Sequence, residues 1–444
     1  PLDSRGGAEY ILRMSLVFLL CALLPVAASS ASEKALDQLS GEAKIEAPPA
    51  PPASPAPFSD GRFWVVVRAA DKAARTRAAE TGLSIEDIRP GTIAGVAHET
   101  TLSQLRAQGF EIVKATPLLR FIQDFPPSDA EYHDYAEMAS ELKAIAQAAP
   151  GLASVFSIGK TVQGRDILAL RLNTDASGTA PSAKPGAVFT GTFHAREHLS
   201  TEVALLLGRF LVEKKDDPKV RELLRTRDVY ILPMINPDGA EFDISTGEYQ
   251  WHRKNMSRNS DGSTGVDLNR NYGYLWGGAG SSGSPWSDTY RGPGAFSEPE
   301  SKAFKSFLEA RRNVKTLISY HSYGELVLYP WGGSDSDVPD AKDLAAYKAL
   351  AAEMGKLTGY APQKSSDLYV ATGDATDWTY AALGIFSFTI ELGGGGFYPG
   401  SGIIGPAAKA NLKAALYLLG LSDDPRRAVL AAAPGPEDYP LSLR

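Results

Sequence analysis

Residues Ala187–His198 read AVFTGTFHAREH, and the rest of the chain is arranged around them. An apolar, β-type run ends at Phe193 and leads directly into a His-x-x-Glu motif. A helical pattern follows, with apolar residues at the i, i+3, i+4, i+7 and i+8 spacing, and Ser200 stands where an N-cap would. We therefore predict a strand, then a turn that carries the motif, then a helix beginning after Ser200. Open α/β sheets place ligands at such strand ends.

The motif supplies two metal donors, the His194 imidazole and the Glu197 carboxylate. A catalytic zinc needs three protein ligands and an open position for water. A rival interpretation adds His198, because H-x-x-E-H is the inverted zincin pattern. That pattern needs all three residues on one helix. The β-branched, Gly-containing segment before His194 and the cap-like Ser200 after His198 argue against it.

Length and net charge limit the classes of protein to which the chain can belong. The chain has 444 residues, more than one average domain, and a net charge of -7, which gives no hint of nucleic-acid binding. Residues 1–31 are interpreted as an upstream extension and a signal peptide (14–31), so we expect a secreted or periplasmic protein. The apolar run of that signal is too short to span a bilayer, and we expect no stable membrane span in the mature protein.

The remaining chain divides by composition. Residues 32–60 form a Pro-rich linker, and 117–128 connect two folded parts. Residues 61–116 are predicted to be a small α+β unit, with strands at 63–67, 93–97 and 110–113 and helices at 71–81 and 102–108. Residues 421–444 are a tail.

Residues 129–420 alternate helical and strand patterns, which predicts a mixed, mainly parallel twisted sheet with helices on both faces. Strands are expected at 187–193, 229–235, 314–320 and 385–392. A turn is expected at 236–239. Ser297 and Glu300 fit a capping box before a helix at 301–311.

Further motifs lie at the ends of other strands. His321 follows one strand and Glu391 ends another, and Asp267-Leu268-Asn269-Arg270 lies in the loop-rich region between Glu197 and His321. Together with Asp367–Trp378, these motifs resemble, in order and spacing, the zinc metallocarboxypeptidases of the carboxypeptidase A type. The bacterial carboxypeptidase T branch is the most similar, and the resemblance runs from about Tyr132 to about Leu419.

The resemblance implies one zinc ion per chain and peptide or protein C-termini as substrates. The implied metal ligands are His194, Glu197 and His321. Asp267 would orient His194, as carboxylates commonly do for ligating imidazoles. Glu391 would be the general base. The substrate's C-terminal carboxylate would be bound by Asn269 and Arg270, Tyr369 would close over the substrate, and Arg196 would line the groove.

One position departs from the family pattern. The arginine that stabilises the oxyanion usually ends an Arg-Lys-x-Arg string, and here that position is Met256, so Arg258 is the candidate substitute. The pocket for the C-terminal side chain would include Asp374 and Thr376, which favours broad specificity.

The resemblance also suggests that residues 61–116 are a pro-segment that covers the groove until it is cleaved. Two alternatives to a general carboxypeptidase remain: a murein-peptide peptidase on the same scaffold, and a low-activity zinc-binding relative, which Met256 favours and Glu391 and Tyr369 oppose.

Overall fold

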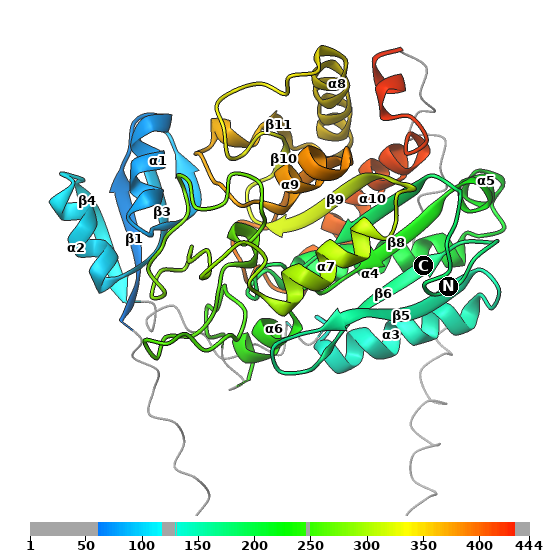
Figure 1. Cartoon of the computed structure of the whole chain (residues 1–444), viewed down its shortest axis with the longest axis horizontal. Coiled ribbons are helices and arrows are strands. Elements are labelled where there is room, and N and C mark those ends of the chain that lie inside the picture. Colours follow the sequence, from blue (N-terminus) through cyan, green and yellow to red (C-terminus); the bar gives the residue numbers. More distant parts are fainter. Residues whose placement is uncertain (1–60, 118–128, 130, 246–248, 431–444) are drawn as a thin grey trace, which may run out of the picture. The chain divides into compact units, whose positions relative to one another are not determined.

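A computed structural model describes residues 61–117, 129, 131–245 and 249–430 (Figure 1). The predicted signal peptide, the Pro-rich linker, most of the connection at 117–128 and the end of the tail lie outside the described residues.

The N-terminal unit is an antiparallel sheet with two helices. Its strand order is β2-β3-β1-β4. The elements are β1 (Arg62–Arg68), α1 (Lys72–Glu80), β2 (Ser84–Arg89), β3 (Thr92–His98), α2 (Glu99–Ala107) and β4 (Ile112–Pro117). No strand was predicted at β2. A register shift between Ile85 and Asp87 breaks the alternation by which a strand is recognised.

The α/β domain is built on an eight-stranded sheet in the order β11-β10-β12-β9-β7-β8-β6-β5. Its central strands β12, β9, β7 and β8 run parallel, and both edges include antiparallel pairings, so the predicted mixed sheet is confirmed. The strands are β5 (Ala153–Lys160), β6 (Asp166–Leu172), β7 (Gly186–Thr190), β8 (Asp228–Leu232), β9 (Val314–Ser322), β10 (Leu326–Tyr329), β11 (Ala361–Lys364) and β12 (Phe386–Leu392).

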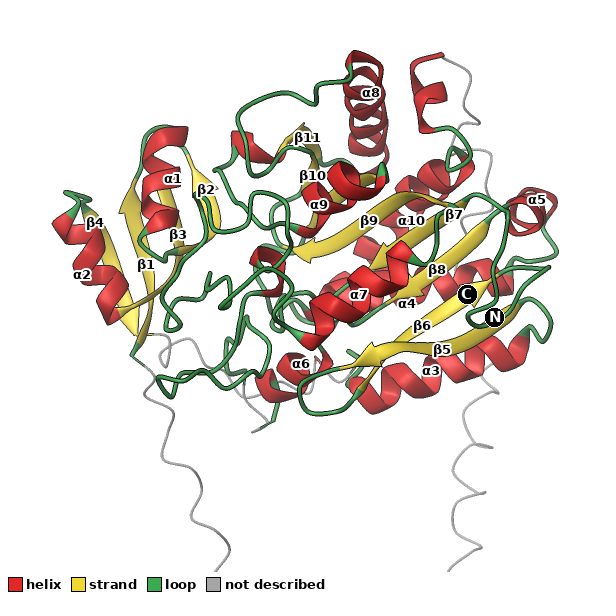
Figure 2. Cartoon of the chain, viewed as in Figure 1, coloured by secondary structure: helices red, strands yellow, loops and turns green. Residues whose placement is uncertain are grey.

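Helices cover both faces of this sheet, as Figure 2 shows. Successive strand residues point to opposite faces. In β6, Leu170 and Leu172 join one buried cluster, whereas Ile167 and Ala169 join the other. The first cluster includes α3 (Tyr135–Ala148), α4 (His198–Glu213), α5 (Pro218–Thr226), α8 (Ala341–Thr358) and α10 (Ile404–Gly420). The second includes α7 (Pro299–Glu309) and α9 (Ala375–Leu383).

Three local predictions were wrong. Helix α4 begins at His198, before Ser200. The predicted turn at 236–239 is the start of a short helix, α6 (Pro237–Asp243), which Asn236 caps through a hydrogen bond from the Gly239 N–H. Helix α7 begins at Pro299 with Glu298, not Ser297, at the N-cap position and without a side-chain cap, and the Ser297 hydroxyl donates to Glu298 Oε1 at 2.6 Å.

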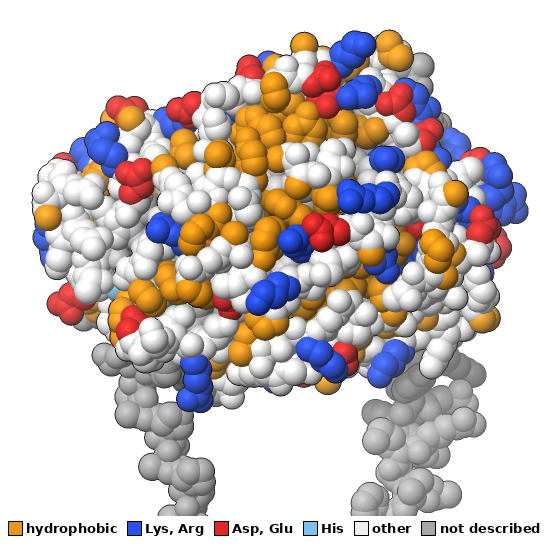
Figure 3. Space-filling model, in the orientation of Figure 1, with side chains coloured by type: hydrophobic (Ala, Val, Ile, Leu, Met, Phe, Trp, Pro, Cys, Tyr) orange, Lys and Arg blue, Asp and Glu red, His pale blue; other side chains and the backbone are white. Residues whose placement is uncertain are grey.

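Across the described residues, no helix combines the length and apolar character needed to cross a membrane. On the face in Figure 3, basic and acidic side chains are interspersed with apolar ones.

Candidate metal and substrate site

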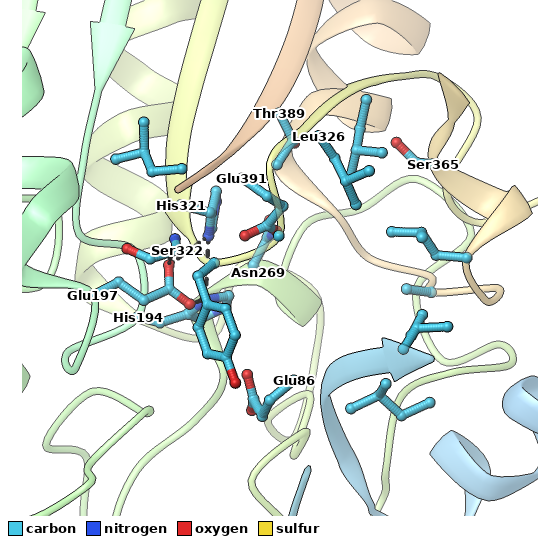
Figure 4. A pocket seen from close by; sticks show the side chains of 18 of the residues that line it. Glu86, His194, Glu197, Asn269, His321, Ser322, Leu326, Ser365, Thr389 and Glu391 are labelled. Atoms are coloured by element: carbon cyan, nitrogen blue, oxygen red, sulfur yellow. Dashed lines mark hydrogen bonds and ion pairs between the residues drawn. The ribbon is translucent and has the colours of Figure 1, made fainter. Parts of the chain in front are cut away.

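Three candidate residues meet because their strands are parallel neighbours. Strands β7, β9 and β12 end at the same edge of the sheet. Within β9 and β12, His321 and Glu391 are register partners, so their side chains project on the same face. His194 follows β7 by four residues. Figure 4 shows these side chains converging on one pocket.

The turn after β7 is shaped by a close backbone approach. A Cβ at Gly191 would lie 2.5 Å from the Ser200 carbonyl oxygen and 2.6 Å from that of Pro233, so only glycine fits. Thr192 follows with a positive φ of 49°. Its N–H donates to Ser200 Oγ at 2.8 Å, and the Ser200 hydroxyl donates to the Glu197 carbonyl at 2.6 Å. Ser200 therefore braces the turn that carries His194 and Glu197.

The donor atoms of His194, Glu197 and His321 all lie within 4.8 Å of one another, and all three side chains are buried. The two Nδ1 atoms face each other at 3.2 Å. Glu197 Oε1 lies 2.7 Å from Nδ1 of His194, and Oε2 lies 2.9 Å from Nδ1 of His321. Two ring nitrogens and a carboxylate gathered at these distances form a donor set that suits zinc.

The outer nitrogens of both rings lie close to oxygen atoms, although Nε2 of His194 lacks hydrogen-bond geometry to a partner in the described residues. Nε2 of His321 lies 3.0 Å from Ser319 Oγ, and Nε2 of His194 lies 3.3 Å from Asp267 Oδ1. Burial opposes ionisation of Asp267, yet Arg253 and His194 hold the pKa of its carboxyl well below the ordinary value. An ionised Asp267 3.3 Å from Nε2 favours the tautomer with its proton on Nε2, which leaves the lone pair of Nδ1 for a metal.

His198 does not join this group. Its Nε2 contacts Asp243 Oδ2 at 3.0 Å, away from the three donors. Although α4 begins earlier than expected, His194 still precedes the helix, so the inverted zincin geometry is absent from the described site.

Glu391 lies on the pocket side of β12, because its neighbours Ile390 and Leu392 point into the opposite core cluster. Burial raises the pKa of its carboxyl well above the ordinary value, and the nearby carboxylates of Glu197 and Glu86 add to the effect. The group is thus arranged to take up and hold a proton.

Asn269 and Arg270 lie in the short helix η3 (Leu268–Arg270) and line the same pocket. The Arg270 guanidinium is fixed by hydrogen bonds from Nε to the Gly280 carbonyl (3.0 Å) and from Nη1 to the Asn269 carbonyl (2.7 Å). Within the described residues, Nη2 has no such acceptor and remains available to a ligand. Asn269 Nδ2 donates to Asp374 Oδ2 at 3.2 Å.

Tyr369 and Asp374 also line the pocket. The Asp374 carboxylate is the N-cap of α9 and accepts hydrogen bonds from the N–H groups of Thr376 (2.6 Å) and Asp377 (2.9 Å). The Thr376 side chain is buried and donates to Asp374 instead of lining the pocket. The structure therefore brings Asp374 to the site and keeps Thr376 behind it.

Arg258 is also not brought to the site. It is exposed, and its backbone bridges to Thr264 in a surface turn. The pocket contains Arg253 instead, whose Nη2 lies 3.0 Å from Asp267 Oδ2. Arg253 begins the string that ends at Met256, and no role was predicted for it. Arg253 and Asp267 lie in different loops, and nothing in the sequence indicates that these loops come close together.

The pocket, a cavity of about 610 Å³, is partly lined by β2 of the N-terminal unit. Ile85, Glu86 and Ile88 contribute to it, and Glu86 is among the pocket side chains labelled in Figure 4. Glu86 is hydrogen bonded and ion paired to Arg196 and lies 3.7 Å from Nη1 of Arg253. Arg196 itself is fully buried. Glu86 was missed because its strand was missed.

The sequence profile of the zinc carboxypeptidase family matches residues 138–414. The chain belongs to this family. It is a metallocarboxypeptidase, a hydrolase whose cofactor is one zinc ion per chain. A zinc carboxypeptidase of Saccharothrix mutabilis subsp. capreolus is 33% identical over 385 residues, covering 80% of this chain and 88% of the relative.

Animal enzymes of the family are also similar. Carboxypeptidase A2 of Rattus norvegicus is 33% identical over 273 residues, which cover 60% of this chain and 64% of that protein. The crystal structure of carboxypeptidase A from Helicoverpa armigera covers 85% of this chain and 100% of its own, with a TM-score of 0.69 and 24% identity, and shares the fold. The finer resemblance to the carboxypeptidase T branch stays an expectation.

Proposed function

We propose that this zinc carboxypeptidase removes the C-terminal residue of peptides or proteins, with His194, Glu197 and His321 as the metal ligands. The observation that carries the proposal is the pair of Nδ1 atoms facing each other at 3.2 Å beside the Glu197 carboxylate. We also propose that the protein is secreted or periplasmic, on the basis of the predicted signal peptide.

Glu391 is the general base. When bound, zinc polarises the scissile carbonyl and lowers the pKa of a water ligand. Glu391 takes the proton from the attacking water and later delivers it to the leaving amine, as one carboxylate can serve both steps. Its burial supports this role, because a raised pKa lets the group hold the proton between the two transfers.

Asn269 and Arg270 hold the substrate's terminal carboxylate, and Tyr369 covers the bound residue. The fixed guanidinium of Arg270 supports this assignment, since an arginine held in place loses little freedom on binding an anion. Occupation of this anion site confines cleavage to the last peptide bond, because an internal residue has no free carboxylate to offer.

Arg253 stabilises the developing oxyanion in place of Arg258. Arg253 lines the pocket and is oriented by Asp267, the same carboxylate that orients His194. Strong fixation matters here, because oxyanion stabilisation depends on donors that need no rearrangement during the reaction.

Broad specificity for the C-terminal side chain is favoured by the state of Asp374. One oxygen accepts the helix-capping hydrogen bonds of α9 and the other accepts from Asn269. Because both of its oxygens already accept hydrogen bonds, the Asp374 carboxylate attracts a basic terminal side chain but does not need one as a partner.

The N-terminal unit acts as an inhibitory pro-segment. Besides Glu86 in the pocket, α1 holds the loop that carries Tyr369. Arg75 donates to the carbonyls of Asp367 (3.0 Å) and Leu368 (2.5 Å), and Thr76 Oγ1 accepts from the Val370 N–H at 3.2 Å. These contacts support a unit that both fills the groove and immobilises the tyrosine loop.

The proposal is tested with purified protein, a dipeptide series ending in Phe, Leu, Lys or Arg, and a chelator. Turnover of several members that is lost with the chelator is expected. His321→Ala should lose nearly all zinc by metal analysis, whereas the matched control His198→Ala should retain it. The opposite result would favour the inverted zincin site.

A further inference from the structure

We propose that Asn255 is a positioning residue that holds the Arg253–Asp267 pair in place. The carboxylates of Glu298 and Glu300 anchor its side-chain amide. The proposal rests on the proposed function, in which Arg253 stabilises the oxyanion and Asp267 orients a metal ligand. It extends that machinery to a residue outside the pocket, because Asn255 is fully buried and does not line the cavity.

Asn255 joins the two loops that carry this pair. Its backbone N–H donates to the Val266 carbonyl at 3.0 Å, and its side-chain Oδ1 accepts from the Val266 N–H at 2.8 Å. Val266 immediately precedes Asp267, and Asn255 follows Arg253 by two residues. A Cβ at Gly265 would lie 2.4 Å from the Asn255 carbonyl oxygen, so the loops approach with no room for a side chain there. This double hydrogen bond therefore sets the spacing of Arg253 and Asp267.

The loop that ends at Asn255 also contacts the metal motif. The Ala195 N–H donates to the Arg253 carbonyl at 3.0 Å, and Ala195 follows His194 directly. Nε and Nη2 of Arg253 lie 3.1 and 3.0 Å from Asp267 Oδ2, and Oδ1 of Asp267 lies 3.3 Å from His194 Nε2. A shift of this loop would therefore move both the guanidinium and the groups around the imidazole, and small displacements of this kind reduce catalysis.

Two carboxylates determine which way the Asn255 side chain points. Its Nδ2 donates to Glu298 Oε2 at 2.8 Å and to Glu300 Oε2 at 2.9 Å. An ionised carboxylate only accepts hydrogen bonds, so the NH2 group must face the start of α7 and the oxygen must face the other loop. The Ser297 hydroxyl donates to Glu298 at 2.6 Å, and this contact holds the first carboxylate in turn. The Val162 N–H donates to Glu300 at 3.0 Å.

The two anchoring carboxylates are costly features of the fold. Both are buried, and within the described residues no lysine, arginine or histidine forms an ion pair with either of them. Burial raises the pKa of Glu300 to about 7, and the charge of Glu298 adds to the effect. Buried carboxylates without a countercharge destabilise a protein, and such costs are typical of functional sites. We therefore assign Glu298 and Glu300 to the positioning of Asn255 and not to stability.

The test separates action through Arg253 from a general loss of structure. All variants are made in the full chain, and kcat is measured with zinc in excess after the cut between Lys114 and Ser128. Asn255→Ala should lower kcat about tenfold or more and leave KM within about twofold, the usual scale for a residue that orients a metal-site group. In the Arg253→Met background the same substitution should cost less than about twofold, because no guanidinium is left to position. Equal losses in both backgrounds would overturn the proposal.

Matched variants control for effects on folding. Asn259→Ala removes a side chain of the same loop that donates to Ser263 Oγ at 3.0 Å and to the Gly265 carbonyl at 3.2 Å, and kcat should stay within about twofold of the parent. If Asn255→Ala does not fold, two variants of Glu298 replace it. Glu298→Ala removes one anchor and should lower kcat about tenfold, whereas Glu298→Gln keeps an acceptor oxygen and should remain within about twofold. Equal kcat values for these two variants would overturn the proposal.

Zinc affinity provides a measurement that needs no turnover. Because Asp267 orients His194, Asn255→Ala should weaken zinc binding about tenfold in competition with a chelator, and Asn259→Ala should not. If the parent hydrolyses no dipeptide ending in Phe, Leu, Lys or Arg, the proposed function fails and zinc affinity alone decides the role of Asn255. Equal zinc affinity in the parent and in Asn255→Ala would then overturn the positioning role.

Discussion

At the scale of single residues, Glu391 is the group on which turnover should depend most. Glu391→Gln keeps the shape of the side chain but cannot accept a proton. We expect the variant to retain its fold and its zinc and to lose at least about 100-fold in kcat, the usual contribution of a general base. Steady-state kinetics with metal analysis checks this, and activity within about tenfold of the parent would remove Glu391 from the mechanism.

Variants of two arginines distinguish the two candidate residues for oxyanion stabilisation. Arg253 lines the pocket, whereas Arg258 is exposed in a surface turn. Arg253→Met should lower kcat about 100- to 1000-fold, as loss of one oxyanion donor typically does. Arg258→Met is the matched control and should remain near the parent. A large loss in the control alone would restore the assignment made from the sequence.

At the scale of elements, the turn between β7 and α4 decides where His194 and Glu197 lie. Gly191→Ala places a methyl group against two backbone carbonyls, which cannot move without displacing α4 or the segment after β8. We expect a loss of several kcal/mol of stability, typical of severe overpacking against fixed backbone, and weakened zinc binding. Thermal unfolding measures it. Gly405→Ala in α10, where a Cβ meets nothing within 4 Å, should be neutral or slightly stabilising.

At the scale of the whole molecule, the N-terminal unit should restrain activity. Glu86, Arg75 and Thr76 contact the groove and the Tyr369 loop. We expect the chain from Ser32 onward to be poorly active, and limited proteolysis between Lys114 and Ser128 to raise its rate on a small C-terminal substrate. Equal rates before and after the cut would make the unit a folding aid or an accessory domain.

The sequence alone determined the features that depend on local pattern. Strand and helix periodicity predicted the mixed sheet. His194, Glu197 and His321 were identified because the order and spacing of the motifs at the strand ends resemble those of the zinc carboxypeptidases. Their donor atoms do meet within 4.8 Å. Element starts were less predictable, since Ser200 and Ser297 make local hydrogen bonds other than the expected caps.

Only the tertiary structure decided which residues from separate loops lie close together. Arg253 reaches the pocket and Arg258 does not, because the pairing of Arg253 with Asp267 joins two loops whose approach no short motif encodes. Thr376 faces Asp374 because the helix cap turns it inward. Glu86 meets Arg196 across 110 residues of sequence. Such contacts follow from packing between elements, and periodicity along the chain contains no information about them.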